Sequence, residues 1–266
     1  MKQLILLALG LMTISFSNAS IVVVNGLSHE HNLQKDGKVQ GTVVVRNTGE
    51  KSKRARIYKT DVTHNCKGET VFSEAVTRDR CNAGWLSLSD NEILMEPGQT
   101  INITYGLTPP ADLDKSGSYW GVIMIEEIED LDTNKPTVGV KVNALVRYAI
   151  QIIGSYDDNA VKQLEIADIK LDTTGGEQHV RISVQNSGNI MMKPIMILEV
   201  YSTDGEQIAR KEIPYQKVYP GYCKVFDIPL ADIPAGSYDS VIVADCGDEN
   251  LYGMRFTLPV LDLSKS

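Results

Sequence analysis

The sequence predicts an all-β protein built from two copies of one antiparallel β-sandwich. Two observations predict this: apolar and polar residues alternate over many short segments, and three landmarks occur twice in the same order. Turns rich in Gly, Pro and Asn separate the alternating segments, as in sandwiches of short strands. The landmarks are Asn47-Thr48-Gly49 with Asn186-Ser187-Gly188, Glu96-Pro97-Gly98 with Tyr219-Pro220-Gly221, and Gly117-Ser118-Tyr119 with Gly236-Ser237-Tyr238.

The first 19 residues stand apart from this pattern. Lys2 is followed by an apolar run over residues 4–11 and by small residues up to Ala19, which is typical of a secretory signal peptide over 1–19. A membrane anchor needs about 20 continuous apolar residues, and polar residues interrupt this run. We therefore expect cleavage and a periplasmic or secreted mature chain without a membrane span.

The net charge of the chain is −8. Nucleic acids and anionic membranes are bound by clustered positive charge, so we expect neither as a partner. The basic run over 51–56 is interpreted as a solvated hairpin end.

The two copies predict two domains, 20–156 and 160–266. Strands are indicated at 39–46 and 101–107 in the first copy and at 180–184 in the second, and the polar turn residues 154–160 mark the boundary. Pro97 follows Asn47 by 50 positions, whereas Pro220 follows Asn186 by 34. The first copy thus has about 16 additional residues, which we interpret as a surface excursion.

Four cysteines are divided equally between the copies: Cys66 and Cys81 in the first, Cys223 and Cys246 in the second. Export brings them into an oxidising compartment, so we expect all four in disulfides. Three connectivities are possible. The duplication favours one bond within each domain, because a bridge between domains would join separate cores. The sequence contains no Cys-x-x-Cys spacing, which would have indicated a zinc site.

One segment is longer than a sandwich strand requires. Every even position from 138 to 152 is apolar, which gives an extended run of about 50 Å at roughly 3.3 Å per residue, against about 17–20 Å for an ordinary strand. Either the strand bends and is paired internally, or it offers an edge to which another chain adds a strand. In the second case the partner-binding residues are Val140, Lys141, Val142, Ala144, Val146, Arg147, Tyr148 and Ile150.

Residues 21–155 resemble the first domain of PapD-like periplasmic chaperones and related bacterial surface sandwiches, with weaker cover of the second copy. The matching stretches are 41–49, 84–88, 94–100, 117–123 and 140–153. The resemblance implies two immunoglobulin-like domains at an angle, in which the last strand of the first lends apolar side chains to an incomplete pilus subunit. It also implies a basic pair that holds the terminal carboxylate of the subunit. Lys141 or Arg147 is a candidate for one of that pair, and residues 21–33 contain no Lys or Arg.

We therefore predict a chaperone-like assembly factor that binds another cell-envelope or pilus-type protein by strand addition along 138–153. The alternative is a structural or adhesive envelope module with no client. No enzyme activity and no cofactor are expected, since the chain contains neither Gly-x-Ser-x-Gly nor a phosphate-binding glycine motif.

Three further groups of residues receive structural interpretations. His29 and His31 are candidate metal ligands, but a solvent-facing strand end is preferred because the sequence identifies no third ligand. Trp85 and Trp120 are interpreted as core or edge packing rather than sugar platforms. An exposed acidic loop rather than a calcium site is expected from Glu126, Glu127, Glu129, Asp130 and Asp132.

Overall fold

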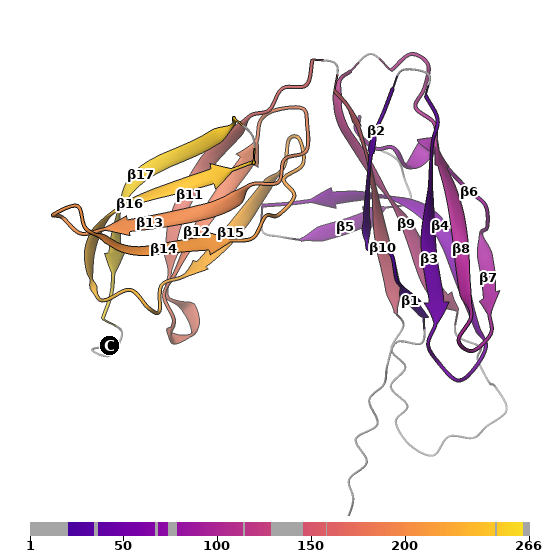
Figure 1. The fold of residues 1–266 in the computed structure, drawn as a ribbon, viewed down its shortest axis with the longest axis horizontal. Coiled ribbons are helices and arrows are strands. Elements are labelled where there is room, and N and C mark those ends of the chain that lie inside the picture. The colour runs from indigo at the N-terminus through magenta and orange to yellow at the C-terminus, as the bar shows by residue number, and fades with distance from the viewer. Residues whose placement is uncertain are drawn as a thin grey trace, which may run out of the picture.

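The computed structural model describes residues 21–34, 37–66, 69–73, 79–113, 115–128, 146–157, 159–247 and 249–262. Strands dominate this part of the chain, and its helical segments are two single 3-10 turns, Ala83–Trp85 and Thr174–Gly176. The strands form four sheets, arranged as two sandwiches (Figure 1). The predicted all-β fold of two tandem sandwiches is confirmed. The signal peptide predicted at 1–19 lies outside the described residues.

The first sandwich contains strands β1 to β10. One sheet has the order β1-β3-β8-β6, and the other has the order β2-β10-β9-β4-β5, with β7 also paired to β4. The first sheet is formed by Ile21–Val23, Val39–Asn47, Thr100–Leu107 and Leu86–Leu88. The second is formed by Ser28–Asn32, Arg147–Tyr156, Gly117–Ile128, Lys53–His64, Thr70–Ser73 and, as β7, Glu92–Met95. Of the strand pairs described, only β2 with β10 is parallel.

The second sandwich contains strands β11 to β17. Its sheets have the orders β11-β12-β15 and β14-β13-β16-β17. They are formed by Leu164–Asp172, His179–Asn186 and Cys223–Pro229, and by Gln207–Ile213, Ile195–Tyr201, Gly236–Asp245 and Leu251–Val260. β10 ends at Tyr156 and β11 begins at Leu164; the domain bounds 20–156 and 160–266 stay a prediction.

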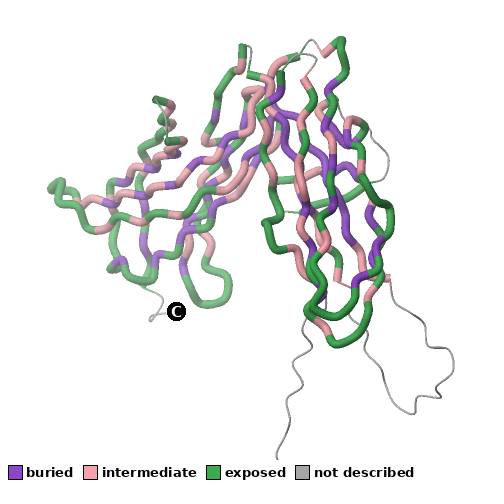
Figure 2. Tube along the Cα trace, turned by 45° about the vertical axis from the view of Figure 1, so that its right-hand side comes forward, coloured by how far each residue is buried: buried purple, intermediate pink, exposed green. Residues whose placement is uncertain are grey.

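Each sandwich has its own apolar core between its two sheets. The alternation in the sequence produces these cores, because a strand turns successive side chains to opposite faces. Val43 and Val45 of β3 face Ile150 and Ile152 of β10, and all four are fully buried. Buried positions run along the facing strands, while turns and strand ends are exposed (Figure 2).

The repeated landmarks make the same hydrogen bonds in both sandwiches. Asn47 is fully buried; its Nδ2 donates to the carbonyls of Lys51 at 2.8 Å and Met95 at 3.0 Å, and its Oδ1 accepts from the Gly49 N–H at 2.9 Å. Asn186 is also fully buried and makes the equivalent bonds to Ile190, Val218 and Gly188 at 2.8, 2.8 and 3.0 Å. One amide thus fastens its own turn to the residue that precedes the Glu-Pro-Gly or Tyr-Pro-Gly landmark.

Asn47→Ala is expected to lower the free energy of unfolding of the first sandwich by roughly 3 kcal/mol, because three hydrogen bonds are lost and buried backbone groups remain unsatisfied. Asn186→Ala should have a similar effect on the second sandwich. Chemical denaturation measures both. Asn102→Ala is the control, since Asn102 is exposed on β8; equal losses in Asn47→Ala and Asn102→Ala would contradict the assignment.

The additional residues of the first copy form an extension of the sandwich. The end of β4, Asp61 to His64, leaves β9 and pairs with β5, Thr70 to Ser73. The resulting β4–β5 hairpin reaches toward the second sandwich (Figure 1). The short turn Ala83–Trp85 and strand β6 follow it in the chain.

Candidate partner-binding site

Strand β10 is paired on both edges over only part of its length. β9 pairs with it from Arg147 to Tyr156, whereas β2 pairs only with Gln151 to Ser155. The residues 147–150 therefore have one edge that no described strand covers, and we call this the open edge. The two alternatives for the long segment thus apply to different parts of it: residues 151–155 are internally paired, and 147–150 are paired on one side.

The path of the N-terminal strands explains the open edge. β1 pairs with β3 in the first sheet, and the chain then crosses to the second sheet, where β2 begins at Ser28. Asn25 fixes the crossing because its Oδ1 accepts from Val44 N–H at 2.9 Å and its Nδ2 donates to the Thr42 carbonyl. Gly26 supplies the turn with a φ of 91°. Val24 and Asn25 are therefore bonded to β3, and the chain returns to β10 only at Leu27, whose carbonyl accepts from the Gln151 N–H.

Two residues turn their backbone groups to the open edge. In an antiparallel pair, alternate residues direct N–H and C=O to opposite sides of the strand. The Val146 carbonyl accepts from Glu127 of β9, and the Gln151 N–H donates to the Leu27 carbonyl at 2.9 Å on the other side. Ala149 and Arg147 lie two and four positions before Gln151, so their N–H and C=O groups point to the same side as those of Gln151 and face the open edge.

The predicted partner-binding residues fall into three groups. Val140, Lys141, Val142 and Ala144 lie outside the described residues. Val146 and Tyr148 are half-buried and Arg147 is exposed. Ile150 is fully buried in the core of the first sandwich, so its side chain has no surface to offer and only its backbone lies near the edge. The role of the group in binding stays a prediction.

Charged side chains around Arg147 pair with one another across strands. Arg147 contacts Glu126 at 3.1 Å, and Arg56 contacts the same carboxylate at 3.5 Å. Burial opposes ionisation of Glu126, yet the hydrogen bonds from Tyr58 and Arg147 outweigh it, so the pKa of Glu126 lies below its ordinary value. Lys53 pairs with Glu127 and Arg54 with Glu92. The basic run thus leads from a turn into the start of β4, where Arg54 and Arg56 are exposed beside acidic neighbours. This agrees with a solvated run, although β4 pairs with β7 and β9 rather than forming a hairpin with β3.

The outer face of the β10-β9-β4 sheet packs against the second sandwich. Trp120 and Met124 of β9, Ile153 of β10 and Tyr219 form a buried cluster there, with Tyr222 beside it. The ring of Trp120 lies 4.5 Å from that of Tyr219 and 5.8 Å from that of Tyr222. Trp120 is 1% exposed and Trp85 packs on the first core, so the interpretation of both as packing residues agrees with the structure. We call this cluster the seam.

Polar contacts accompany the seam. Tyr219 Oη donates to Oε1 of Gln151 at 2.7 Å, and the Met191 N–H donates to Ser118 Oγ at 2.8 Å. Sequence reasoning did not identify Tyr219 and Tyr222 as contact residues. A signal was present: aromatic residues flank Pro220-Gly221, whereas Glu96 and Gln99 flank Pro97-Gly98. The exchange of polar for aromatic side chains at matching positions marks the face that the second sandwich buries.

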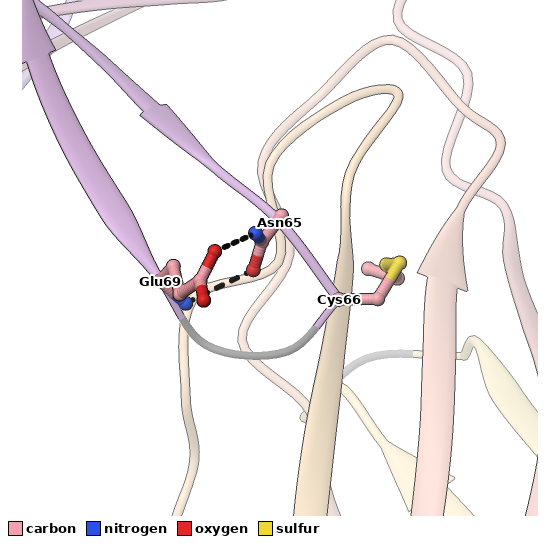
Figure 3. Close-up of a disulfide and its surroundings, with 4 residues drawn as sticks. Asn65, Cys66 and Glu69 are labelled. Carbon is pink, nitrogen blue, oxygen red and sulfur yellow. Dashed lines mark hydrogen bonds between the residues drawn. A yellow bond between two sulfur atoms is a disulfide. The ribbon is translucent and has the colours of Figure 1, made fainter.

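A disulfide joins the two sandwiches next to the seam. Cys66, at the tip of the β4–β5 hairpin, is bonded to Cys223 at the start of β15, with their Cα atoms 5.0 Å apart (Figure 3). Asn65 and Glu69 brace the hairpin: Asn65 Nδ2 donates to Glu69 Oε2 at 2.6 Å, and the Glu69 N–H donates to Asn65 Oδ1 at 3.0 Å.

The expected disulfide within each domain is therefore wrong. The duplication favoured local pairs, but the extra residues of the first copy carry Cys66 across to the second core. Cys81, which is buried, and Cys246, which is half-buried, retain their thiols.

A basic pair lies where β2 begins. Lys193 contacts Glu30 of β2 at 2.6 Å, and Lys217 contacts the same carboxylate at 3.7 Å and donates to Ser28 Oγ. The Lys217 side chain is 18% exposed, and burial lowers its pKa. Lys217, Tyr219 and Gln151 line a hollow of about 200 Å³ between the sandwiches. Nothing in the sequence pattern singles out these two lysines.

The candidate metal ligands occupy inward positions. His29 and His31 are half-buried on β2, and both rings approach the hydroxyl of Tyr105 on β8. Their interpretation as a solvent-facing strand end is therefore wrong. Of the acidic segment, Glu126 and Glu127 are ion-paired as described above, and residues 129, 130 and 132 lie outside the described part of the chain.

Solved structures of fimbrial chaperones are similar to this chain over most of its length. A chaperone–tip adhesin complex of CFA/I fimbriae biogenesis is 17% identical, with 91% of this chain and 100% of that chain covered and a TM-score of 0.49. The class 5 fimbriae chaperone CfaA is 13% identical (90% and 100% covered, TM-score 0.49). The CsuC–CsuE chaperone–tip adhesion subunit complex from Csu pili of Acinetobacter baumannii is 13% identical (89% and 98% covered, TM-score 0.47).

No protein-family model matches the sequence, and no curated protein matches it. At identities below 20% and TM-scores below 0.5, none of the structural similarities assigns a function to this chain. Within the described part of the chain, no helix has the length and apolar character of a membrane span.

Proposed function

We propose that this chain is an exported, non-enzymatic assembly factor that holds another cell-envelope or pilus-type protein by strand addition at the open edge of β10. The observation that supports this proposal best is the half-paired strand: residues 147–150 have β9 on one side, and on the other side no described strand pairs with them. In this proposal residues 1–19 are removed on export, the domains are 20–156 and 160–266, and the protein acts in the periplasm or after secretion.

The surroundings of the open edge suit an apolar strand. Val24 is 54% exposed and Leu27 is 48% exposed, and both lie in the crossing segment that leaves the edge uncovered. An added strand would form main-chain hydrogen bonds with Arg147 and Ala149. An uncovered edge is otherwise a site of unspecific pairing, which favours an edge with a dedicated occupant.

The direction of β2 indicates how the partner would lie. β2 runs parallel to β10, and Ser28 is opposite Gln151. A parallel strand beside 147–150 therefore continues the line of β2 and ends at Ser28. Lys217 bonds to Ser28, and Lys193 bonds to Glu30 next to it. We assign to these two lysines the role of holding the terminal carboxylate, which the resemblance to PapD-like chaperones gives to a basic pair.

Hydrogen exchange tests the proposal. The amides of Arg147 and Ala149 should exchange within seconds in the isolated chain and become at least tenfold slower when a partner protein is bound, whereas the amide of Ile150, bonded to β9, should be protected in both states. Slow exchange of Arg147 and Ala149 in the isolated chain would instead support the alternative of a structural or adhesive module with an internally covered strand.

A backbone variant sharpens this test. Ala149→Pro removes an N–H that faces the open edge and leaves the bonds to β9 in place, so capture of the partner should fall at least tenfold while both sandwiches stay folded. Ala149→Ser retains the N–H and serves as the matched control. Equal capture by both variants would contradict strand addition at this position.

A further inference from the structure

Three side-chain atoms with lone pairs that can bind a metal ion lie close together between the two sheets of the first sandwich. His29 and His31 occupy alternate positions of β2 and therefore project on the same face of the sheet. Tyr105 of the facing strand β8 is 1% exposed. Its Oη lies 2.9 Å from Nδ1 of His29 and 2.8 Å from Nε2 of His31. The third donor that the sequence did not identify is thus a phenol from the opposite sheet.

The backbone beside Tyr105 leaves room for its hydroxyl to reach both histidines. A Cβ atom on Gly41 of β3 would lie 2.2 Å from Tyr105 Oη, so only glycine at position 41 lets the hydroxyl reach the two imidazoles. The hydroxyl has one proton and donates to one of the two ring nitrogens, so the other ring nitrogen must carry a hydrogen to donate to Oη. Nε2 of His29 is buried without a hydrogen-bond partner among the described residues. Burial lowers the pKa of both histidines.

We propose that His29 Nδ1, His31 Nε2 and Tyr105 Oη form a binding site for a divalent transition metal ion, preferentially Cu²⁺. Two imidazoles and an oxygen donor are the ligand set that Cu²⁺ takes in tetragonal geometry, and Cu²⁺ binds such sets more tightly than the other divalent ions of its row. Ligands about 2.0 Å from a metal at right angles lie about 2.8 Å from each other, close to the observed separations. The metal would rest on the three donors, with water completing its coordination.

Binding converts the phenol to a phenolate. The Tyr105 O–H bond breaks, the metal–oxygen bond forms, and one proton goes to solvent; no oxidant or reductant takes part. Burial raises the pKa of Tyr105 to about 12, so the phenol is protonated in the metal-free chain at neutral pH. His29 and His31 are half-buried, so part of each residue is exposed to solvent.

Calorimetric titration of the metal-free mature chain with CuCl₂, in a form without a polyhistidine tag, tests the site. We expect one ion per chain, release of one proton near pH 7 measured in buffers of different ionisation enthalpy, and a visible phenolate-to-copper absorption band. Tyr105→Phe should abolish both the band and the proton release and weaken binding at least tenfold. His31→Gln should also weaken binding at least tenfold, and it provides a second variant if Tyr105→Phe disturbs the fold. His179→Gln on β12 is the matched control and should bind as the parent does.

Two results would overturn the proposal. Less than stoichiometric binding at micromolar copper would show that the three side chains are joined by hydrogen bonds only and do not form a metal site. Binding that persists unchanged in Tyr105→Phe and His31→Gln would place the ion elsewhere on the chain. Neither result bears on strand addition at β10, which is measured without metal.

Discussion

Replacing Cys66 and Cys223 together by serine is expected to lower the free energy of unfolding by up to about 5 kcal/mol, the largest effect we predict for this chain. The disulfide closes a loop with a sequence separation of 157 residues, and the chain-entropy model gives about 4.7 kcal/mol for a 100-residue loop. Most of the loss comes from the unfolded chain, whose conformational entropy rises when the bond is removed. The variant should also unfold in two separate transitions, because each sandwich has its own core.

Chemical denaturation followed by fluorescence and circular dichroism measures both effects, since probes that no longer coincide reveal two transitions. Cys246→Ser is the control because it removes a thiol outside the bond. Peptide mapping without reductant should recover Cys66 linked to Cys223. A peptide that links Cys66 to Cys81 would contradict the assigned bond, and so would equal stability of the double variant and the control.

Trp120→Ala is expected to cost about 4 kcal/mol, within the range of buried Trp or Phe truncations. Trp120 is 1% exposed and packs against Tyr219 and Tyr222 from the second sandwich. The loss should therefore appear in the coupling between the sandwiches as well as in the first sandwich. Trp85→Ala is the comparison, because Trp85 is half-buried against the first core alone.

A double-mutant cycle distinguishes the two roles. The contact between the two sandwiches is weakened both by Trp120→Ala and by replacement of the two cysteines. The effects of these changes on the free energy of unfolding should therefore not be additive. Trp85→Ala should combine additively with the cysteine pair. Additive behaviour of Trp120→Ala would show that the seam contributes to the first sandwich only.

The seam and the disulfide matter for the proposed function because they set what lies beside the open edge. Lys193 and Lys217 belong to the second sandwich, yet they contact Glu30 and Ser28 of β2. If the sandwiches separated, the open edge would remain and the two lysines would leave it. Loss of the disulfide is thus expected to weaken the hold on a terminal carboxylate more than the main-chain pairing at Arg147 and Ala149.

The sequence by itself determined the features that depend on neighbouring residues. Alternation at period two predicted β3, β8, β10 and β12, because side-chain direction in a strand reverses at every residue. The repeated Asn47 and Asn186 turns predicted the duplication, and each amide bonds to the turn that follows it. The length of 138–153 left two alternatives open, a strand paired internally and an edge to which another chain adds a strand.

Only the tertiary structure decided which distant segments meet. The duplication favoured Cys66 with Cys81, but the β4–β5 hairpin brings Cys66 to Cys223. The sequence pattern could not identify Tyr105 as the neighbour of His29 and His31, since β8 and β2 belong to facing sheets. Periodicity records which way a side chain points, whereas the surface it meets depends on how whole sheets pack, and that packing is set by the summed burial of many residues.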